Sequence, residues 1–426
     1  MGAAPKALDP LPRRADVIVV GGGVVGLCVA HYLTESGREV VLIDRAGFGD
    51  GASFGNAGLV APSHAIPFPA VGAIRDGLRW LFDGQSPFYV RPSFDLERLG
   101  WLMRFALASG RRRSEAGAAV LSELLLASAA SFREDFAGRG DLNFAYHSDG
   151  VLAIHATPQS LERGLAEGRL LERFGIASQP LDGAELSALE PTLSPALAGA
   201  MLWPQDGHLD PYLLISQLVG SLARRGVRFE WSTEVLSFSL DRGRVGSLRT
   251  TAGEIEPTEL VLAAGAWSPG LSRQLGLRLP MQAGKGYSIT AATGEEVPRR
   301  PLLFADARVV ATPLRGRLRL AGTLELVGHD MGISRRRVDA IRAVGESFLA
   351  GVKMDPQARI WRGLRPLTAD GLPVIGRPRG LSNVVIATGH GHLGVSLGPV
   401  TGRIVSELAA GGGWPTDLSA VSPDRF

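Results

Sequence analysis

A glycine-rich turn near the N-terminus places the strongest constraint on how this chain can fold. The β-branched run at residues 16–20 is typical of a buried parallel strand, and it leads directly into Gly-Gly-Gly-Val-Val-Gly at positions 21–26. A helix is then predicted over residues 27–36, and a second buried strand, 40–44, ends in an acid. This order of strand, glycine turn, helix, strand and acid predicts a dinucleotide-binding βαβ unit.

Each part of this unit has a physical task. Gly21 permits the tight turn, Gly23 lets the backbone approach a pyrophosphate, and Gly26 lets helix and strand pack closely. The N-terminus of the helix supplies amide donors and the positive end of its dipole to the phosphates. Asp44 can accept a hydrogen bond from a ribose hydroxyl, and its charge disfavours the extra phosphate of NADP.

Composition narrows the class of protein. A chain of 426 residues favours two domains, and a formal charge of +3, from 45 basic and 42 acidic residues, lacks the dense basic field of a nucleic-acid-binding protein. The single cysteine, Cys28, excludes an intrachain disulfide, favours a reducing, cytoplasmic location, and is expected to be buried. We expect no metal site. Residues 1–14 are expected to be a disordered lead-in, and no uninterrupted apolar run reaches the roughly 20 residues of a membrane span.

Three later segments indicate which cofactor is bound. A small, polar loop occupies residues 51–58, and a strand ending in a second glycine turn occupies 259–268. The segment 361–376 leads through a strand at 384–387 to Gly-His-Gly-His-Leu-Gly at 389–394. With these motifs the chain resembles, over nearly its whole length, the glycine/D-amino acid oxidase family of flavoproteins. The loop that continues to His64 and the segment 285–288 are similar to the D-amino acid dehydrogenase branch of that family.

The resemblance implies an α/β fold in which a Rossmann-like FAD-binding domain of the GR2 type is interleaved with an antiparallel-sheet α+β substrate domain. The FAD-binding domain would comprise residues 1–65, 206–279 and 358–426. The substrate domain would comprise 66–205 and 280–357, with a helical insertion at about 66–113. Its strands are expected at 150–155, 200–203, 286–290 and 318–322, and a helix at 212–225 is expected to be capped by Asp210.

Non-covalently bound FAD is the cofactor that the resemblance implies. The C-terminal turn at 389–394 and the helix after it would point amides at the carbonyl end of the flavin, where the helix dipole stabilises the anionic reduced ring. The predicted cofactor-binding residues are Gly21, Gly23, Val24, Val25, Gly26, Asp44, Arg45, Ser53, Asn56, Ala57, Gly58, Val235, Ala264, Gly265, Trp267, Gly363, Gly389, His390, Gly391, Leu393 and Gly394.

Four residues are predicted to act on the substrate. By the resemblance, Arg365 grips the substrate carboxylate through two parallel hydrogen bonds, although an arginine here can also simply clamp two domains. Tyr287 can hydrogen-bond carboxylate or amine, and Glu325 can meet the substrate ammonium unless it is a surface carboxylate. His392 lies near flavin or substrate, or else fills space in the packing. His64 and Asn56 can touch either ligand.

The implied reaction is oxidation of a D-amino acid, including cyclic ones such as D-proline or hydroxy-D-proline. Hydride would pass from the α-carbon to flavin N5, and the imine would give a 2-oxo acid. Electrons would pass to a quinone or another acceptor. Two alternatives remain open: an oxygen-using oxidase for glycine or sarcosine, and the flavin subunit of a multi-subunit dehydrogenase.

The stretch 66–113 allows two interpretations. Its aromatic residues are Trp80, Phe82, Phe88, Trp101 and Phe105, and its arginines are Arg91, Arg98, Arg104 and Arg111–113. Aromatics flanked by arginines suit a helix that lies on a membrane surface or a partner, and hence a peripheral position on the inner face of the cell membrane. An ordinary amphipathic helix packed on the body of the protein explains the same pattern.

Overall fold

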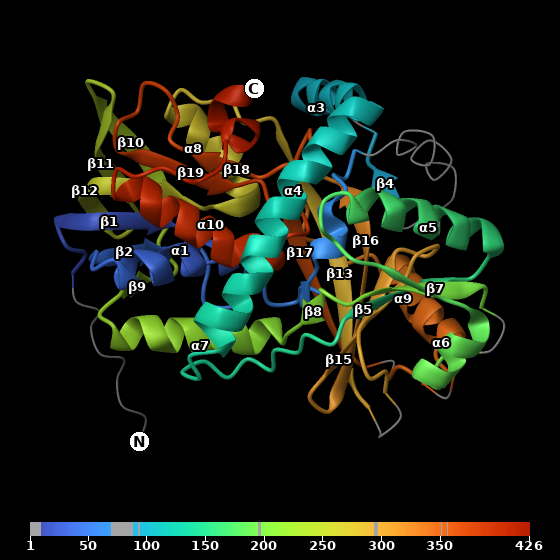
Figure 1. The fold of residues 1–426 in the computed structure, drawn as a ribbon. Coiled ribbons are helices and arrows are strands. Elements are labelled where there is room, and N and C mark those ends of the chain that lie inside the picture. Colours follow the sequence, from blue (N-terminus) through green and yellow to red (C-terminus); the bar gives the residue numbers. More distant parts are fainter. Residues whose placement is uncertain are drawn as a thin grey trace, which may run out of the picture.

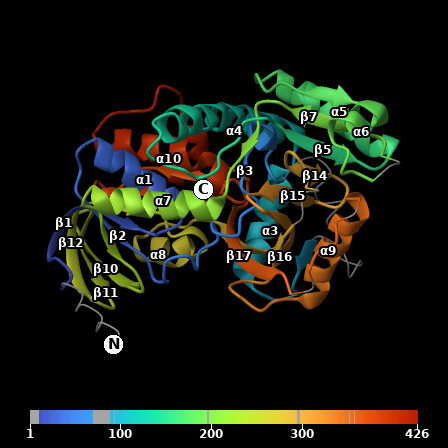
Figure 2. The same ribbon diagram turned by 90° about the horizontal axis from the view of Figure 1, so that it is seen from below.

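Two β-sheets, each with its own helices, make up the molecule (Figure 1). The computed structural model describes residues 10–69, 88–92, 94–194, 197–293, 297–350, 352–355 and 357–426. The chain passes between the sheets several times, so both are built from segments far apart in the sequence (Figure 2). This mixed α/β architecture is the one that the sequence predicts.

The first sheet has eight strands and a parallel centre. The centre runs in the order β9-β2-β1-β12-β19, with β18 antiparallel to β19, and the β10–β11 hairpin extends from the first half of β12. The strands are β1 (Arg14–Val20), β2 (Val40–Ile43), β9 (Arg228–Glu230), β10 (Val235–Asp241), β11 (Arg244–Thr250), β12 (Gly253–Leu262), β18 (Val374–Gly376) and β19 (Val384–Thr388).

Both faces of this sheet are covered, which is why its central strands are continuous apolar runs. Side chains on one face, such as Val19 and Leu42, join a core with the helices, and Ile18 and Ile43 on the other face join Leu275 and the hairpin. The helices are α1 (Val24–Glu35), α4 (Arg111–Ser131), α7 (Pro211–Arg224), α8 (Ser268–Gln274) and α10 (Gly394–Ala409). The predicted cap is present, since Asp210 accepts hydrogen bonds from the amides of Tyr212 and Leu213.

The second sheet has nine strands and is largely antiparallel. Its order is β17-β13-β16-β15-β14-β5-β7-β6, and β4 pairs with β16. The strands are β4 (Phe88–Val90), β5 (Val151–His155), β6 (Gln179–Leu181), β7 (Gly199–Trp203), β13 (Met281–Ala292), β14 (Leu302–Phe304), β15 (Val309–Leu314), β16 (Arg317–Leu326) and β17 (Arg359–Thr368). Helix α9 (Arg335–Phe348) buries Val338 and Ile341 against β13 and β16.

Further elements complete the fold. These are β3 (Leu59–Val60), which pairs with β8 (Gly207–His208), and the helices α3 (Leu96–Ala108), α5 (Pro158–Glu172) and α6 (Gly183–Leu189). A π-helical turn, Phe132–Ala137, extends α4, and 3-10 turns occupy Pro62–Ala65, Gly265–Trp267, Ser419–Val421 and Pro423–Arg425.

Two of the predicted domain boundaries differ from the structure. We assigned residues from 358 onward to the FAD-binding domain, but β17 pairs with β13 along ten residues and belongs to the nine-stranded sheet. We assigned 66–205 to the substrate domain, but α4 packs on α10 and shares the core of the eight-stranded sheet. In both cases an apolar face is buried against an element that lies far away in sequence.

The predicted lead-in, residues 1–14, and the predicted insertion, 66–113, are only partly described by the structure. Arg14 already pairs in β1, so the lead-in is shorter than predicted, and residues 1–9 lie outside the described residues. Trp80 and Phe82 of the insertion also lie outside them. Within the described ranges one helical stretch, Arg111–Ala137, is long and apolar enough to cross a membrane. It buries Leu121, Leu125 and Phe132 in the protein core, as the core helix of a soluble domain does.

Candidate active site

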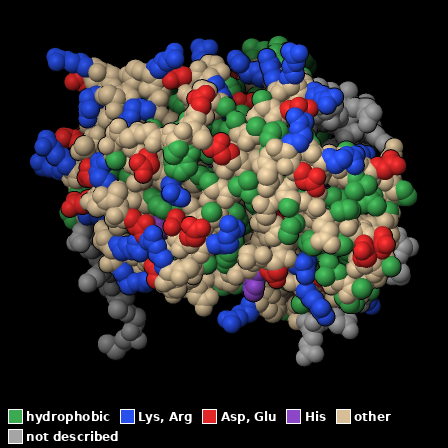
Figure 3. Space-filling model, viewed as in Figure 1, with side chains coloured by type: hydrophobic (Ala, Val, Ile, Leu, Met, Phe, Trp, Pro, Cys, Tyr) green, Lys and Arg blue, Asp and Glu red, His purple; other side chains and the backbone are tan. Residues whose placement is uncertain are grey.

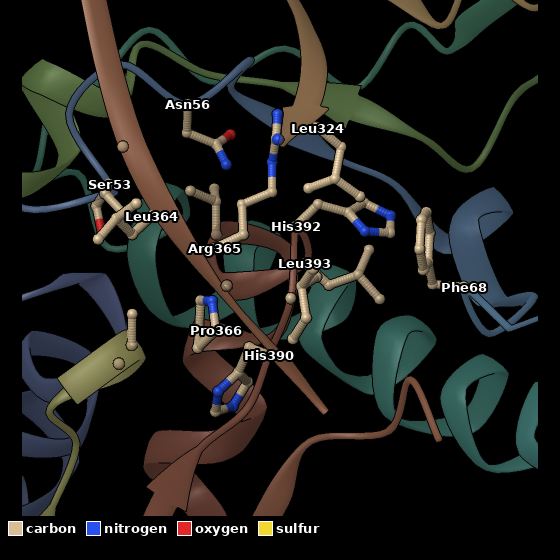
Figure 4. Close-up of a pocket in the computed structure, with 18 of the residues that line it drawn as sticks. Ser53, Asn56, Phe68, Leu324, Leu364, Arg365, Pro366, His390, His392 and Leu393 are labelled. Atoms are coloured by element: carbon tan, nitrogen blue, oxygen red, sulfur yellow. The ribbon is translucent and has the colours of Figure 1, made fainter. Parts of the chain in front are cut away.

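A cavity of about 1790 Å³ lies between the two sheets and receives side chains from both. Typical pockets for one small ligand measure about 300–1,000 Å³, so this cavity has room for a dinucleotide and a substrate together. One end is formed by the glycine turn after β1, and the middle by β17 and the turn before α10. Figure 4 shows Asn56, Arg365 and His392 on its wall.

The turn after β1 is shaped to admit phosphates. Gly21 has a φ of 120°, and a Cβ at this residue would lie 2.3 Å from the carbonyl oxygen of Ala263, so no other residue fits. Helix α1 begins directly after the turn, and its N-cap, Gly23, provides no side-chain cap. The start of α1 therefore faces the cavity as an anion site, where Ser53 Oγ already accepts from the amide of Val24 at 3.0 Å.

Asp44 lies at the end of β2, where a ribose is expected. Its two carboxylate oxygens accept hydrogen bonds from the amides of Gly22 at 2.6 Å and Ala46 at 2.7 Å. Burial raises the pKa of this carboxyl, and the two amides oppose that rise. The amide bonds hold the carboxylate on the cavity wall next to the turn, as binding of a ribose hydroxyl requires.

The turn before α10 is fastened to the strand that carries Arg365. The amide of Gly391 donates to the carbonyl of Pro366 at 2.9 Å, and the backbone of His390 forms an isolated antiparallel β-bridge with that of Leu367. The imidazole of His390 pairs with Thr401 Oγ1 at 2.9 Å, and burial lowers its pKa to about 3. Helix α10 begins at Gly394 without a side-chain cap, so its positive end also faces the cavity.

Arg365 is half-buried in the wall of the cavity, and no described carboxylate pairs with it. Its Nη1 donates to the carbonyl of Thr323 at 2.7 Å, and burial lowers its pKa to about 10, so it stays charged at neutral pH. Space for the guanidinium depends on Gly286, because a Cβ there would lie 2.2 Å from Nη1. A guanidinium with free donors in a buried site fits a bound carboxylate.

Tyr287 and Glu325 form a network behind the cavity wall. The Tyr287 hydroxyl donates to Glu325 at 2.5 Å, and Glu325 also pairs with Lys285 at 3.3 Å and Arg337 at 2.7 Å. Tyr287 lines the cavity, whereas Glu325 does not. The predicted contact of Glu325 with the substrate ammonium therefore does not fit the structure, because its carboxylate is already neutralised by two cations.

Two histidines face each other across the substrate side of the cavity. The rings of His64 and His392 lie 5.6 Å apart, edge to face. Burial, together with the charges of nearby arginines, lowers the pKa of His64 to about 4 and that of His392 to about 3. Both imidazoles are therefore neutral at physiological pH, and both line the cavity.

Most of the predicted site residues lie on this one cavity. Four of them do not line it: Gly26, Gly58, Gly389 and Glu325. The three glycines act through the backbone instead; a Cβ on Gly26, for example, would lie 1.9 Å from the carbonyl oxygen of Gly21. The prediction missed several lining residues from separate elements, among them Trp101, Arg163, Glu167, Arg308, Met331 and Trp361. Of these, Trp361 stood inside a motif that the sequence singled out for the cofactor, and Trp101 inside the aromatic stretch 66–113. Across the described ranges no three His, Cys, Asp or Glu side chains gather to hold a metal ion.

Comparison with known proteins identifies the family of the chain. Residues 16–408 match the model of the FAD dependent oxidoreductase (DAO) family. The chain belongs to this family. It is 33% identical to a D-amino acid dehydrogenase of Paramagnetospirillum magneticum, over 96% of this chain and 98% of that protein. It is 32% identical to a D-amino acid dehydrogenase of Methylobacterium sp. (strain 4-46), over 93% and 95%.

A solved structure supports the same fold. Glycine oxidase from Geobacillus kaustophilus superposes with a TM-score of 0.78 at 25% identity, covering 97% of this chain and all of that one. FAD is the cofactor of this family of oxidoreductases, and the residues present fit it: two uncapped helix starts for anionic groups, Asp44 for a ribose, and a cavity large enough for a dinucleotide.

Proposed function

We propose that this protein uses FAD to oxidise a D-amino acid at its α-carbon, giving an imine and then a 2-oxo acid, and that its electrons pass to a quinone. The observation that carries the proposal is Arg365, a half-buried guanidinium with no carboxylate partner among the described residues, on the wall of a flavin-sized cavity. Relatives named D-amino acid dehydrogenase, similar along almost their entire length, support the stereochemistry.

The side chains around the cavity have complementary tasks in this reaction. Arg365 binds the α-carboxylate as a fork and so fixes the direction of the Cα–H bond. Hydrogen bonding to Glu325 and burial raise the pKa of Tyr287, so its phenol remains a hydrogen-bond donor. Bound FAD supplies the acceptor for the hydride that leaves the α-carbon. The neutral rings of His64 and His392 can accept hydrogen bonds from the substrate amine, and the ammonium group releases its proton to water before the amine reacts. Cyclic substrates such as D-proline carry the same carboxylate and amine.

A quinone acceptor is supported by helix α3. Its inner side chains Trp101, Leu102 and Phe105 line the cavity, and Trp101 Nε1 donates to the carbonyl of Leu367 at 3.1 Å. Its outer side chains form an exposed apolar stripe, Leu96, Leu99, Met103 and Leu107, with exposed fractions of 46% to 81%. Figure 3 shows hydrophobic side chains gathered over α3 beside Lys and Arg side chains.

We propose that this stripe rests on an anionic lipid surface on the cytoplasmic side. The apolar stripe would enter the lipid, while Arg104 and Arg111–Arg113 beside it would face the anionic head groups. One helix would then connect the membrane, where quinones dissolve, to the cavity that its inner face lines.

Anaerobic reduction of the flavin tests the reaction directly. The purified, FAD-loaded protein is mixed with D- and L-forms of alanine, proline, glutamate and lysine, and with glycine and sarcosine, while the visible flavin band is followed. We expect D-forms to bleach the band and L-forms to leave it unchanged. Bleaching by glycine or sarcosine alone, with peroxide released in air, would instead identify an amine oxidase.

A further inference from the structure

A second arginine, Arg308, shares the cavity with Arg365. It lies in the turn between β14 and β15, where its backbone takes a left-handed conformation with a φ of 54°. Such a conformation is uncommon for a residue other than glycine and tends to persist where a function requires it. Its side chain lines the cavity, and within the described part of the chain no carboxylate forms an ion pair with it.

Electrostatics locate Arg308 close to the substrate end of the cavity. Its charge lowers the pKa of both His64 and His392, and the charge of Arg365 lowers the pKa of His392 as well. Arg308, Arg365, His64 and His392 all line the same cavity. Two arginines and two neutral histidines thus surround one volume, into which the α-carboxylate held by Arg365 would bring a single negative charge.

Two acids lie on this side of the cavity, and each interacts with an arginine. Asp306 accepts from the amide of Ala156 at 3.0 Å and pairs with Arg163 at 3.4 Å, so its charge is already used. Glu167, on α5, lines the same cavity near Arg308; burial raises its pKa, and the charge of Arg308 opposes that rise. Arg308 therefore brings a positive charge to this end of the cavity that Glu167 offsets only when its carboxyl is ionised, which burial disfavours.

We propose that Arg308 binds a second carboxylate of the substrate, so that the preferred substrates are dicarboxylic D-amino acids such as D-glutamate and D-aspartate. This inference rests on the proposed oxidation of D-amino acids, and it specifies which side chain the preferred substrate carries. Arg308 would act as a specificity-determining residue, because a guanidinium binds a carboxylate through two parallel hydrogen bonds and gains little from an apolar or amide side chain.

Kinetics with an isosteric pair of substrates test the assignment. D-Glutamine differs from D-glutamate only at the terminal group, so the ratio of kcat/KM for the two reports recognition of the second carboxylate. We expect this ratio to be about 10 to 100 in the wild-type protein, since a charged hydrogen bond contributes about 1.5–3 kcal/mol. The variant R308Q should lower the ratio to about 1, R308K should retain part of it, and R336Q, on an exposed position of α9, should leave it unchanged.

A binding measurement separates this inference from the proposed reaction. Glutarate and butyrate have no amine and cannot react, and each is titrated into the FAD-loaded protein while the flavin spectrum is followed. Glutarate should bind more tightly than butyrate, and R308Q should remove the difference even if no D-amino acid reduces the flavin. Equal binding of the two acids, or equal use of D-glutamate and D-glutamine, overturns the assignment. A preference for D-lysine that E167Q abolishes also overturns it, and assigns the side-chain site to Glu167.

Discussion

The guanidinium of Arg365 donates to the carbonyl oxygen of Thr323, at 2.7 Å, across the width of β13. Thr323 has a φ of 67°, and the register of β13 and β16 shifts between Lys285 and Tyr287 beside it. Such a bulge turns a carbonyl out of the ladder of a sheet. Here it fixes one donor of the guanidinium and leaves the others for a ligand.

Substitution of Arg365 should abolish carboxylate recognition without loss of the cofactor. R365Q removes the charge and the fork, so we expect kcat/KM for any D-amino acid to fall at least ~100-fold, mostly through KM. R365K keeps a charge but loses the bidentate geometry, so it should retain only a small part of the wild-type kcat/KM. Steady-state kinetics measure both, and the flavin spectrum should remain that of wild type. A normal KM in R365Q would assign the arginine to clamping the two sheets instead.

Gly286 should be as important for the substrate as the arginine beside it. A Cβ at this position meets Nη1 of Arg365 at 2.2 Å, so G286A should displace the guanidinium and lower kcat/KM by up to ~100-fold. The matched control is G284A, two residues earlier on the same strand, where the Cβ meets only Leu324 and Leu367. We expect G284A to lower the melting temperature while KM changes little. Equal effects of the two variants on KM would show that general disruption of β13 is responsible.

The turn after β1 was predictable because its chemistry is local. Gly21 and Asp44 are joined by one helix and one strand, so their order in the sequence already fixes the geometry that the structure shows. The role of Arg365 was predicted from the segment 361–376, which resembles a family motif. In each case a short segment carried enough information to place the side chain.

The substrate end of the cavity was not predictable in the same way. Arg308, Glu167 and Trp101 come from three elements that only the long-range packing brings to one wall. Glu325 was misjudged because successive side chains on a strand point to opposite faces: Leu324 lines the cavity, while Glu325 points away from it and meets Arg337 on α9. No pattern in the sequence distinguishes these two directions before the partner strands are known.

A methyl group in the phosphate-binding turn should prevent FAD binding. G21A is strained by its φ of 120° and places a Cβ 2.3 Å from the carbonyl oxygen of Ala263. We expect purified G21A to lack the flavin spectrum and to lose the thermal stabilisation that added FAD gives the wild-type protein. The control is G51A, on the same cavity wall, where a Cβ has no atom within 4 Å. G51A should bind FAD as the wild type does, and retention of FAD by G21A would contradict the assigned role of the turn.

Asp206 should make the stability of the protein depend on pH. It accepts from the amide of Ser63 at 2.9 Å and from its hydroxyl at 2.5 Å, beside His64, and burial raises its pKa to about 7. Because the folded state binds this proton more tightly than the unfolded chain, its contribution is full below pH 4 and is lost as the pH rises through 7. The loss amounts to at most about 4 kcal/mol of the free energy of unfolding.

The variant D206N isolates this contribution. An amide keeps one acceptor for the amide of Ser63 and one donor for its hydroxyl, so it imitates the protonated acid. Denaturant unfolding between pH 4 and 8 should show equal stabilities of wild type and D206N near pH 4, and a growing advantage of D206N toward pH 8. E162Q, at an exposed carboxylate, should follow the wild type throughout. Parallel curves for D206N and wild type would mean that Asp206 is ionised in the folded state across this range.

Helix α3 should hold the protein on anionic membranes through its outer stripe. The triple variant L99E/M103E/L107E places three charges on that stripe and should abolish sedimentation with vesicles that contain phosphatidylglycerol. L240E changes an equally exposed leucine on β10, outside the stripe, and should sediment as the wild type does. Removing Arg111, Arg112 and Arg113 should weaken the binding by about 1 kcal/mol for each charge and reduce its sensitivity to salt.

In the triple variant, reduction of a vesicle-bound quinone should fall while reduction of a water-soluble dye persists, because the cavity itself is unchanged. Unaltered sedimentation of the triple variant would leave α3 as an ordinary covering helix and would remove the structural support for a membrane-dissolved acceptor.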